Sequence, residues 1–318
     1  MSTPQMNHQP QAPEGNTTGL KEFVLLGFSD VPHLQWFLFG LLIIVYVIIL
    51  VGNGTIVLIT RVDSTLQTPM YFFLGYFSFS EMCYVSVTLP RMLFNLATQR
   101  RTISFTACAT QMCFTLILGA TECFLLAVMA YDRYVAICNP LRYPLLMNPR
   151  VCTQLVVGSW VCGIPGQVGQ TSQIFSVPFC GCKQINHFFC DIPPVLYLAC
   201  GNIFVNEMMV FLGALVFVLV PFLLIIFSYS KIISTVRKLP SATSRTKAFS
   251  TCSSHLAVVV LFFGSAIITY FRPSASHSGG TDKVLSLFYT VVTPMFNPMV
   301  YSLRNKDVLM ALEKLFCK

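Results

Sequence analysis

Two acidic residues, Glu81 and Glu122, interrupt apolar runs of this 318-residue chain that are otherwise free of charge. A carboxylate within the hydrocarbon core of a bilayer is costly, and it marks an ion path, a proton relay or a polar binding site. The alternative is that each carboxyl is protonated, or hydrogen-bonded to Asn53 or Asn297, and only joins neighbouring helices. Both interpretations predict a buried polar centre, and the first makes an ion-coupled transporter or channel one candidate class.

A second charged group, Asp132-Arg133-Tyr134, ends another apolar run. An arginine at a membrane edge needs a partner, and Asp132 is adjacent. The simplest interpretation is a static ion pair, with the Arg133 side chain extended to the interface. In the last apolar run, Pro298 removes a helical hydrogen bond and can place a bend there.

Four cysteines, Cys180, Cys182, Cys190 and Cys200, lie in one polar gap of the sequence. Facing an oxidising compartment they would form disulfides, but the sequence does not determine their pairing. His187 and Cys190 have a spacing typical of a metal site, although a disulfide-bonded sulfur is not a thiolate ligand. We find no nucleophile–base constellation and no phosphate-binding loop, and therefore expect no enzymatic activity.

The elements that must position these residues are indicated by the composition. Hydrophobic residues make up 55% of the chain and charged residues only 10%, whereas about a quarter of a soluble domain is charged. The net charge of +8 sits in short gaps between apolar runs and forms no basic stripe, which argues against nucleic-acid binding. The composition therefore predicts a membrane protein.

Seven apolar runs are long enough to cross a bilayer core of about 30 Å as helices of about 20 residues. They cover residues 34–60, 70–89, 102–130, 151–175, 208–230, 248–271 and 284–303. We predict an all-α membrane protein with an extracellular tail over 1–33, a seven-transmembrane bundle over 34–303 and a cytoplasmic amphipathic helix over 304–318. That last helix would lie along the inner leaflet.

The basic residues orient the bundle. Thirteen of the twenty Lys and Arg residues lie in the gaps after runs one, three and five and in the C-terminal tail, and this side is expected to be cytoplasmic. The N-terminus is then outside, where Asn16-Thr17-Thr18 forms a glycosylation acceptor. The residues before Leu34 lack the features of a signal peptide.

The motifs at the cytoplasmic ends are the most specific feature. Asp132-Arg133-Tyr134 in the third run and Asn297-Pro298-x-x-Tyr301 in the seventh resemble those of rhodopsin-like G-protein-coupled receptors. Three further strings, together with the long form from Met129 to Cys138, resemble the olfactory receptors: PMYFFL from Pro69, Ser228-Tyr229, and KAFSTCSSHL from Lys247. The resemblance covers nearly the whole chain, from about Phe23 to Lys306.

The resemblance implies a switch at the cytoplasmic side. Arg133 would be released on activation to face a G protein, while Tyr229 and Tyr301 swing inward below the bend at Pro298. The implied coupling and switch residues are Asp132, Arg133, Tyr134, Tyr229, Lys247, Asn297, Pro298 and Tyr301.

The resemblance also implies an allosteric sodium ion at Glu81 and Glu122, with Asn53 beside them. Most rhodopsin-like receptors have Asp in the second span, and the longer Glu81 alters the expected ion geometry. The implied disulfides are Cys108–Cys190 and Cys180–Cys200; Cys182 has no assigned partner, so an alternative bridge stays open.

A ligand pocket is expected in the outer half of the bundle. Counting 3.6 residues per turn from Arg133 places Met112, Thr115, Leu116, Gly119 and Ala120 on the interior face of the third span. In the fifth and sixth spans the resemblance implies Gly213, Phe217, Phe263, Ile267 and Tyr270. This set is apolar and contains no acid, which favours a small, mostly apolar ligand and argues against an amine.

We therefore expect an odorant receptor that activates a stimulatory, olfactory-type heterotrimeric G protein and raises cyclic AMP. It would be a multi-pass protein of the plasma membrane, in olfactory cilia, without a cofactor other than the sodium ion. Two alternatives stay open: a chemoreceptor for a non-volatile ligand outside the nose, and the ion-coupled transporter.

Overall fold

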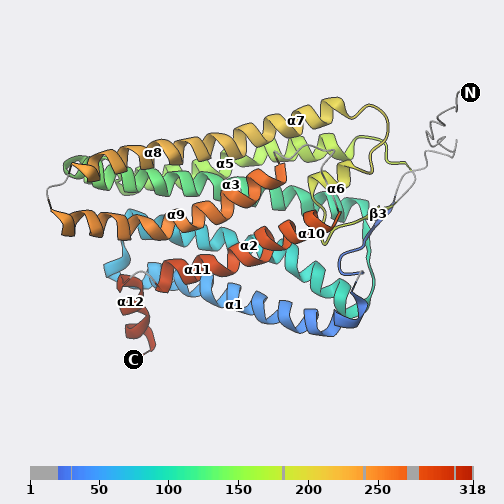
Figure 1. Ribbon diagram of the computed structural model, residues 1–318, viewed down its shortest axis with the longest axis horizontal. Coiled ribbons are helices and arrows are strands. Elements are labelled where there is room, and N and C mark those ends of the chain that lie inside the picture. The colour runs from blue at the N-terminus through green and yellow to red at the C-terminus, as the bar shows by residue number, and fades with distance from the viewer. Residues whose placement is uncertain are drawn as a thin grey trace, which may run out of the picture.

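The computed structural model describes residues 21–29, 31–180, 183–238, 241–270, 279–303 and 306–316. Within them, seven helices are long and apolar enough to cross a membrane. This confirms the predicted number of spans, although several helices run beyond the predicted apolar runs. Figure 1 shows them as a bundle with a small sheet at one end and a short helix, α12 (Lys306–Phe316), at the other. We call these two ends the sheet end and the α12 end.

The first four spans are single helices. They are α1 (Gln35–Val62), α2 (Pro69–Thr98), α3 (Phe105–Cys138) and α5 (Pro149–Phe175). Three of them begin with a recognisable signal: Pro69 and Pro149 occupy the first turns of α2 and α5, where a missing N–H costs nothing. The Ser104 hydroxyl caps α3 by accepting from the amide of Ala107, as expected for an N-cap serine.

The other spans are less regular. The fifth consists of α7 (Phe204–Ala214), the π-helical segment η4 (Leu215–Leu219) and α8 (Val220–Arg237). The sixth is α9 (Ala242–Tyr270), and the seventh consists of α10 (Gly279–Leu287), the π-helical segment η6 (Phe288–Val292) and α11 (Thr293–Leu303). Besides α12, the described residues form two short α-helices outside the spans, α4 (Tyr143–Leu146) and α6 (Ile192–Leu196).

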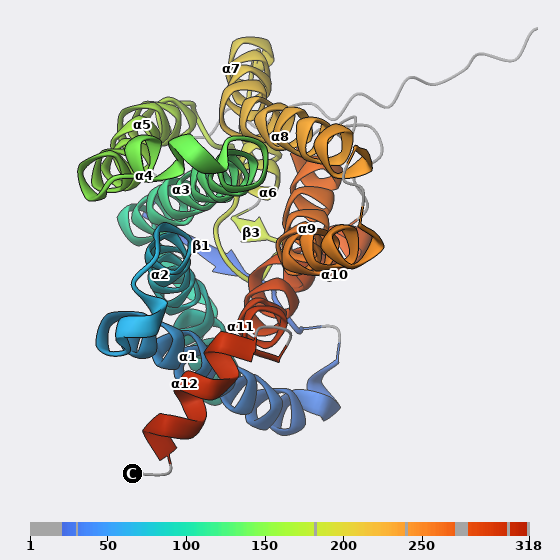
Figure 2. The same ribbon diagram turned by 90° about the vertical axis from the view of Figure 1, so that its left-hand side faces the viewer.

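The α3 helix is the centre of the bundle. It packs against α2, α5, α8 and α9, and in the end-on view of Figure 2 it lies among these neighbours. Half of its side chains are accordingly buried, including Leu125, Leu126 and Ala130. Whatever binds inside the bundle therefore contacts α3.

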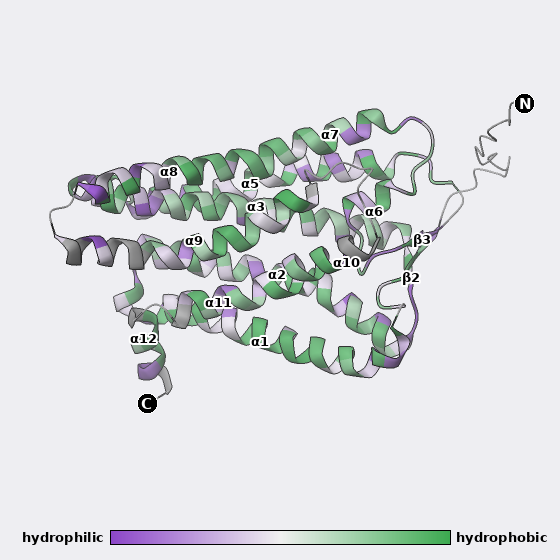
Figure 3. Cartoon of the chain, in the orientation of Figure 1, coloured by the Kyte–Doolittle hydropathy of each residue, from purple (hydrophilic) through white to green (hydrophobic). Residues whose placement is uncertain are grey.

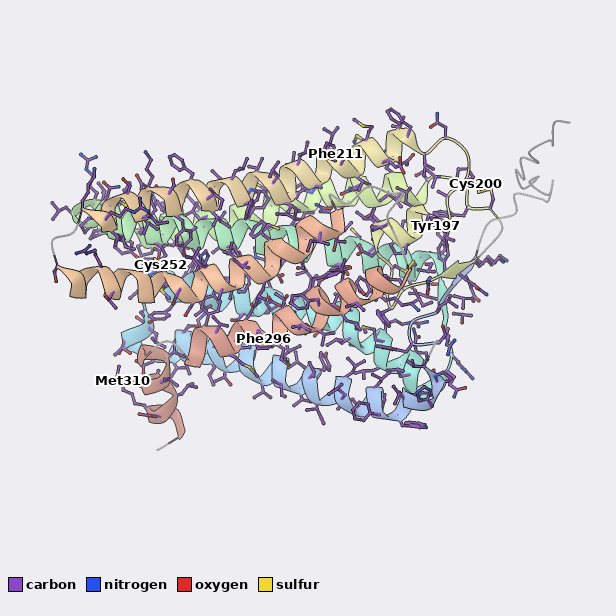
Figure 4. The ribbon with its side chains drawn as sticks, viewed as in Figure 1. Tyr197, Cys200, Phe211, Cys252, Phe296 and Met310 are labelled. Atoms are coloured by element: carbon purple, nitrogen blue, oxygen red, sulfur yellow. A yellow bond between two sulfur atoms is a disulfide. The ribbon has the colours of Figure 1, made fainter. Side chains whose placement is uncertain are left out.

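Large apolar side chains also cover the outside of the bundle, and Figure 3 shows apolar residues along much of the length of the helices. Phe37 is 66% exposed and Val260 69% exposed, and Phe211 and Phe296 project from α7 and α11 (Figure 4). An exterior of this kind is unfavourable in water but matches hydrocarbon.

The sheet end is closed by a three-stranded sheet with the order β2-β1-β3. The strand β1 (Glu22–Leu25) pairs antiparallel with β2 (Thr102–Ser104) and parallel with β3 (Gln184–Ile185). Phe23 at its centre is fully buried against Phe105 and Phe179. The last part of the expected N-terminal tail is thus an ordered strand that joins two loops of the bundle.

At the opposite end, α12 turns away from the bundle axis (Figure 1). Its Val308 and Ala311 are buried against the bundle, whereas Met310 is 52% exposed. Lys314 forms an ion pair with Asp63 at 3.4 Å, and hydrogen bonds from Thr65 to Asp63 lower the pKa of that carboxyl. The short amphipathic helix predicted for the C-terminus is confirmed.

Candidate functional site

A cavity of about 100 Å³ lies inside the half of the bundle nearer the sheet end. Most of its wall is formed by residues of α3, α5, α6, α7, η4 and α9. The remaining lining residues belong to α2, η6 and α11. The wall is mainly apolar: it contains Leu116, Ala120, Cys123, Ile192, Val210, Ala214, Phe217, Val218, Phe262 and Ala266. A cavity of about 150 Å³ is enough to hold benzene, so a ligand of this cavity is small.

Six of the ten residues expected at a pocket line this cavity: Thr115, Leu116, Gly119, Ala120, Gly213 and Phe217. Met112 does not line it but is fully buried in the apolar cluster beneath the sheet. Phe263 and Ile267 do not line it either, because α9 turns Phe262, Ser265, Ala266 and Thr269 towards it. The face of α9 that lines the cavity thus lies one residue earlier than expected, and Phe263 is instead fully buried in the core. The side chain of Tyr270 lies outside the described residues.

The two π-helical segments supply part of the wall. Phe217 and Val218 belong to η4, and Tyr289 belongs to η6. Each segment ends two residues before a proline, Pro221 or Pro294, which has no N–H to donate to the carbonyl four residues earlier. The helix can therefore take up an extra residue per turn, and such π segments often occur at functional sites. The two prolines are the sequence signal that could have located them.

Two glycines let α5 and the fifth span interlock beside the cavity. A Cβ atom at Gly166 would lie 2.4 Å from Cζ of Phe217, and one at Gly213 would lie 3.1 Å from the amide of Gln170. Each helix therefore places a large side chain over a glycine of the other. The position of the Phe217 ring, and with it the size of the cavity, depends on Gly166 having no side chain.

We predict that Gly166→Ala displaces Phe217 and reduces ligand affinity at least about tenfold. Overpacking of this kind also costs about 1–3 kcal/mol of stability. The measurement is the ligand-concentration dependence of the response and of the melting temperature. The matched control is Gly169→Ala on the same helix, where a Cβ would meet nothing within 4 Å. Equal affinity in both variants would contradict the prediction.

Acidic residues form the floor of the cavity. Glu81 and Glu122 both line it, and both are at most 2% exposed. The prediction that the pocket contains no acid is therefore wrong. The cavity extends further along α3 than the residues that were predicted to line it. The sequence argument that excluded an amine ligand no longer holds.

The carboxyl of Glu81 is connected to α11, and Asn53 bonds within its own helix, α1. The Asn297 side chain donates a hydrogen bond to Oε1 of Glu81, and Asn53 donates to the carbonyl of Ile49 at 3.1 Å. Asn53 Oδ1, Glu81 Oε2, Glu122 Oε1 and Asn297 Oδ1 are buried and have no hydrogen-bond partner among the described residues. Four orphaned oxygens are a donor set that suits a hard cation. The described part of the chain contains no group of three or more His, Cys, Asp or Glu side chains arranged to hold a metal ion.

The expected ion pair between Asp132 and Arg133 is not what the structure shows. Tyr143 of α4 donates a hydrogen bond of 2.8 Å to Oδ1 of Asp132, while the Arg133 guanidinium contacts the sulfur of Met70. Burial and the nearby Asp132 raise the pKa of Tyr143, which keeps it a donor. Tyr143 was not anticipated, because it reaches Asp132 only after the chain turns at the end of α3.

The other switch residues gather near Arg133 at the α12 end. Tyr229 OH and His255 Nδ1 lie 2.8 Å apart, and His255 Nε2 lies 3.1 Å from the carbonyl of Leu126. A carbonyl only accepts, so Nε2 carries the hydrogen; in the neutral ring Nδ1 then accepts from Tyr229. This chain joins α8, α9 and α3. Tyr301 OH is buried with no partner among the described residues.

The remaining expected residues have simpler surroundings. Tyr134 packs against the apolar core. Pro298 of α11 is closely packed on α1, since a Cβ at Gly52 would lie 3.1 Å from its ring. The Lys247 side chain, Cys182 and Asn16 lie outside the described residues.

Both disulfides occur in the pairing that the resemblance implied, Cys108–Cys190 and Cys180–Cys200. The amide of Cys190 donates to Oε1 of Gln111 at 3.1 Å, so its loop is attached to α3 twice. Because Cys190 is bonded to Cys108, its sulfur is not available to a metal beside His187.

A seven-span bundle with a small internal cavity and a polar cluster at the far end is the architecture of a membrane receptor. A family model described as olfactory receptor matches residues 42–318. The human olfactory receptor 10AG1 is 59% identical over 93% of this chain and 99% of that protein. The human olfactory receptor 10C1 is 52% identical over 94% of this chain and 96% of its own length. The chain belongs to the olfactory receptor family, whose members are odorant-sensing G-protein-coupled receptors and not enzymes.

Proposed function

We propose that this receptor binds a small, mostly apolar odorant in the cavity and activates a stimulatory, olfactory-type G protein, which raises cyclic AMP. The cavity carries the proposal: it is small and largely apolar, with a few polar groups, as ligand sites are. It also lies between α3, α5, the fifth span and α9, three of which continue to the cluster around Arg133. A ligand that fits one arrangement of these helices better shifts the population towards it.

The test is a cyclic AMP reporter assay of the expressed chain against a broad odorant panel, with surface expression confirmed. We expect a concentration-dependent response to a few small odorants. Silence across the panel, with the receptor at the surface, would contradict the odorant proposal. Receptor activation by a non-volatile metabolite alone would favour the chemoreceptor outside the nose, and ion flux without a G protein would favour the transporter.

The orientation follows from the same proposal. The α12 end faces the cytoplasm, where basic residues concentrate, and the sheet end faces outside, where the disulfides form. In this orientation α12 lies on the inner leaflet with Met310 towards lipid, and Asn16 is accessible for glycosylation. The receptor then belongs in the plasma membrane, in olfactory cilia.

We also propose an allosteric sodium ion at the floor of the cavity. Asn53, Glu81 and Glu122 would hold this ion through their orphaned side-chain oxygens. The ion would supply positive charge to two carboxyls that share one site and would favour the inactive arrangement.

We predict that raising sodium lowers basal signalling of the native receptor, and that Glu81→Ala and Glu122→Ala abolish this dependence. Removing either carboxylate takes away an ion ligand and half of the negative charge. The measurement is basal cyclic AMP and the melting temperature in sodium or in N-methylglucamine. Unchanged sodium dependence and unchanged basal signalling in both variants would overturn the proposal.

A further inference from the structure

Four hydroxyl groups of the cavity wall have already used their hydrogens, whereas the buried hydroxyl of Thr293 has no hydrogen-bond partner among the described residues. Thr115, Ser265 and Thr269 each donate to a backbone carbonyl three or four residues earlier, at 2.8, 2.8 and 2.9 Å. Tyr289 donates to Oδ2 of Asp191 at 2.6 Å. A hydroxyl has one hydrogen and two lone pairs, so these groups present only acceptor oxygens to a ligand.

Gln167 adds an acceptor that has no partner. It belongs to α5, lines the cavity and is 4% exposed. Its Oε1 atom is buried without a hydrogen bond in the described part of the chain. A buried acceptor without a hydrogen bond destabilises the protein, and a ligand that donates to it recovers this cost. The carboxyl oxygens at the floor are acceptors as well.

We propose that the cavity selects ligands that donate a hydrogen bond, small alcohols in an otherwise apolar frame, and that Gln167 accepts this bond. The inference deepens the proposed function and rests on the cavity being the ligand site. Gln167 lies on the fourth span, which sequence reasoning had not included in the pocket, because a glutamine in an apolar run gives no indication of which face it occupies.

The selection against carbonyl compounds follows from which hydrogen bonds each ligand can form with the cavity wall. An alcohol and the ketone of the same frame fill the same volume, but the ketone oxygen only accepts. It can accept from a donor of the wall such as the Thr293 hydroxyl, but it leaves Oε1 of Gln167 unpaired. A site built to pair a substrate hydroxyl rejects the analogue that lacks it far more strongly than an apolar site does.

The experiment measures binding directly on the purified full-length receptor in lipid nanodiscs. The probes are cyclopentanol, cyclopentanone and cyclopentane, and the readout is the shift in melting temperature with probe concentration. We expect cyclopentanol to bind at least about tenfold more tightly than cyclopentanone. In Gln167→Met, which keeps the length of the side chain, the two should bind within about twofold, while cyclopentane binding is unchanged.

The matched control is Gln173→Met on the same helix, because Gln173 does not line the cavity; it should keep the preference for the alcohol. Gln167→Glu should keep it too, since the acceptor remains. Equal binding of alcohol and ketone by the native receptor, no binding of any probe, or a preference that survives Gln167→Met would overturn the inference. A cyclic AMP response to other odorants in those cases would leave the proposed function standing.

Discussion

Replacing Cys108 or Cys190 by serine is expected to abolish surface expression of the receptor at 37 °C. The bond closes a segment with a sequence separation of 82, and constraining an unfolded loop of that size contributes about 4.5 kcal/mol to stability. The native contacts depend on it as well. Cys108 and Cys190 are fully buried in the cluster beneath the sheet, together with Phe23 and Met112, so either variant would bury a serine hydroxyl and a freed thiol among apolar side chains.

The second disulfide is the internal comparison. Cys180 and Cys200 are separated by only 20 residues, for which the loop-closure contribution is about 3 kcal/mol, and Cys180 is exposed. We expect Cys180→Ser with Cys200→Ser to lower surface expression without abolishing it. Expression is measured by antibody labelling of intact cells, and stability by thermal unfolding of purified protein. Equal losses for the two pairs would show that loop length and burial do not set their contributions.

Arg133→Ala is expected to abolish the cyclic AMP response while leaving ligand binding nearly intact. Arg133 acts electrostatically on Tyr229, His255 and Tyr301, which come from α8, α9 and α11, and none of the four lines the cavity. Coupling between a ligand site and a distant partner site amounts to about 1–3 kcal/mol, or about 5- to 150-fold in affinity. If Arg133 faces the G protein, as the proposed switch requires, removing it should remove this coupling.

Two measurements separate coupling from folding. The ligand-induced shift in melting temperature should persist in Arg133→Ala, and addition of the G protein should no longer raise ligand affinity. Tyr143→Phe is the control at the same end of α3: it removes one hydrogen bond to Asp132, worth about 1 kcal/mol, and should change the response by no more than about fivefold. A full response in Arg133→Ala would refute the proposed switch.

The sequence by itself determined the global layout. Apolar runs of bilayer length specified seven helices, because a buried backbone in lipid has to satisfy its hydrogen bonds internally. Motif residues such as Asp132 and Asn297 assigned the family, and the resemblance carried the pairing Cys108–Cys190. These features depend on local chain composition or on short strings, which no tertiary contact is needed to recognise.

Only the tertiary structure decided which face of the sixth span lines the cavity. On a soluble helix the polar face marks the outside. Lipid is as apolar as the protein core, and the sixth span, α9, carries apolar residues on all its faces within the membrane. Phe262 and Phe263 are therefore equivalent by type, and the rotation of α9 had to be observed to place the first in the cavity. The π-helical segments added further rotation in the fifth and seventh spans.

The positions and partners of the polar groups in the site likewise depend on the tertiary structure. Glu81 and Glu122 were recognisable as buried acids, but their presence in the cavity wall depends on how far the space between α3 and the other helices extends. Tyr143 matters because it bonds to Asp132 on another helix. Gln167 matters because its Oε1 atom has no partner among the described residues. Hydrogen bonds between side chains of different helices carry no local sequence signal, since they form only when packing brings the helices together.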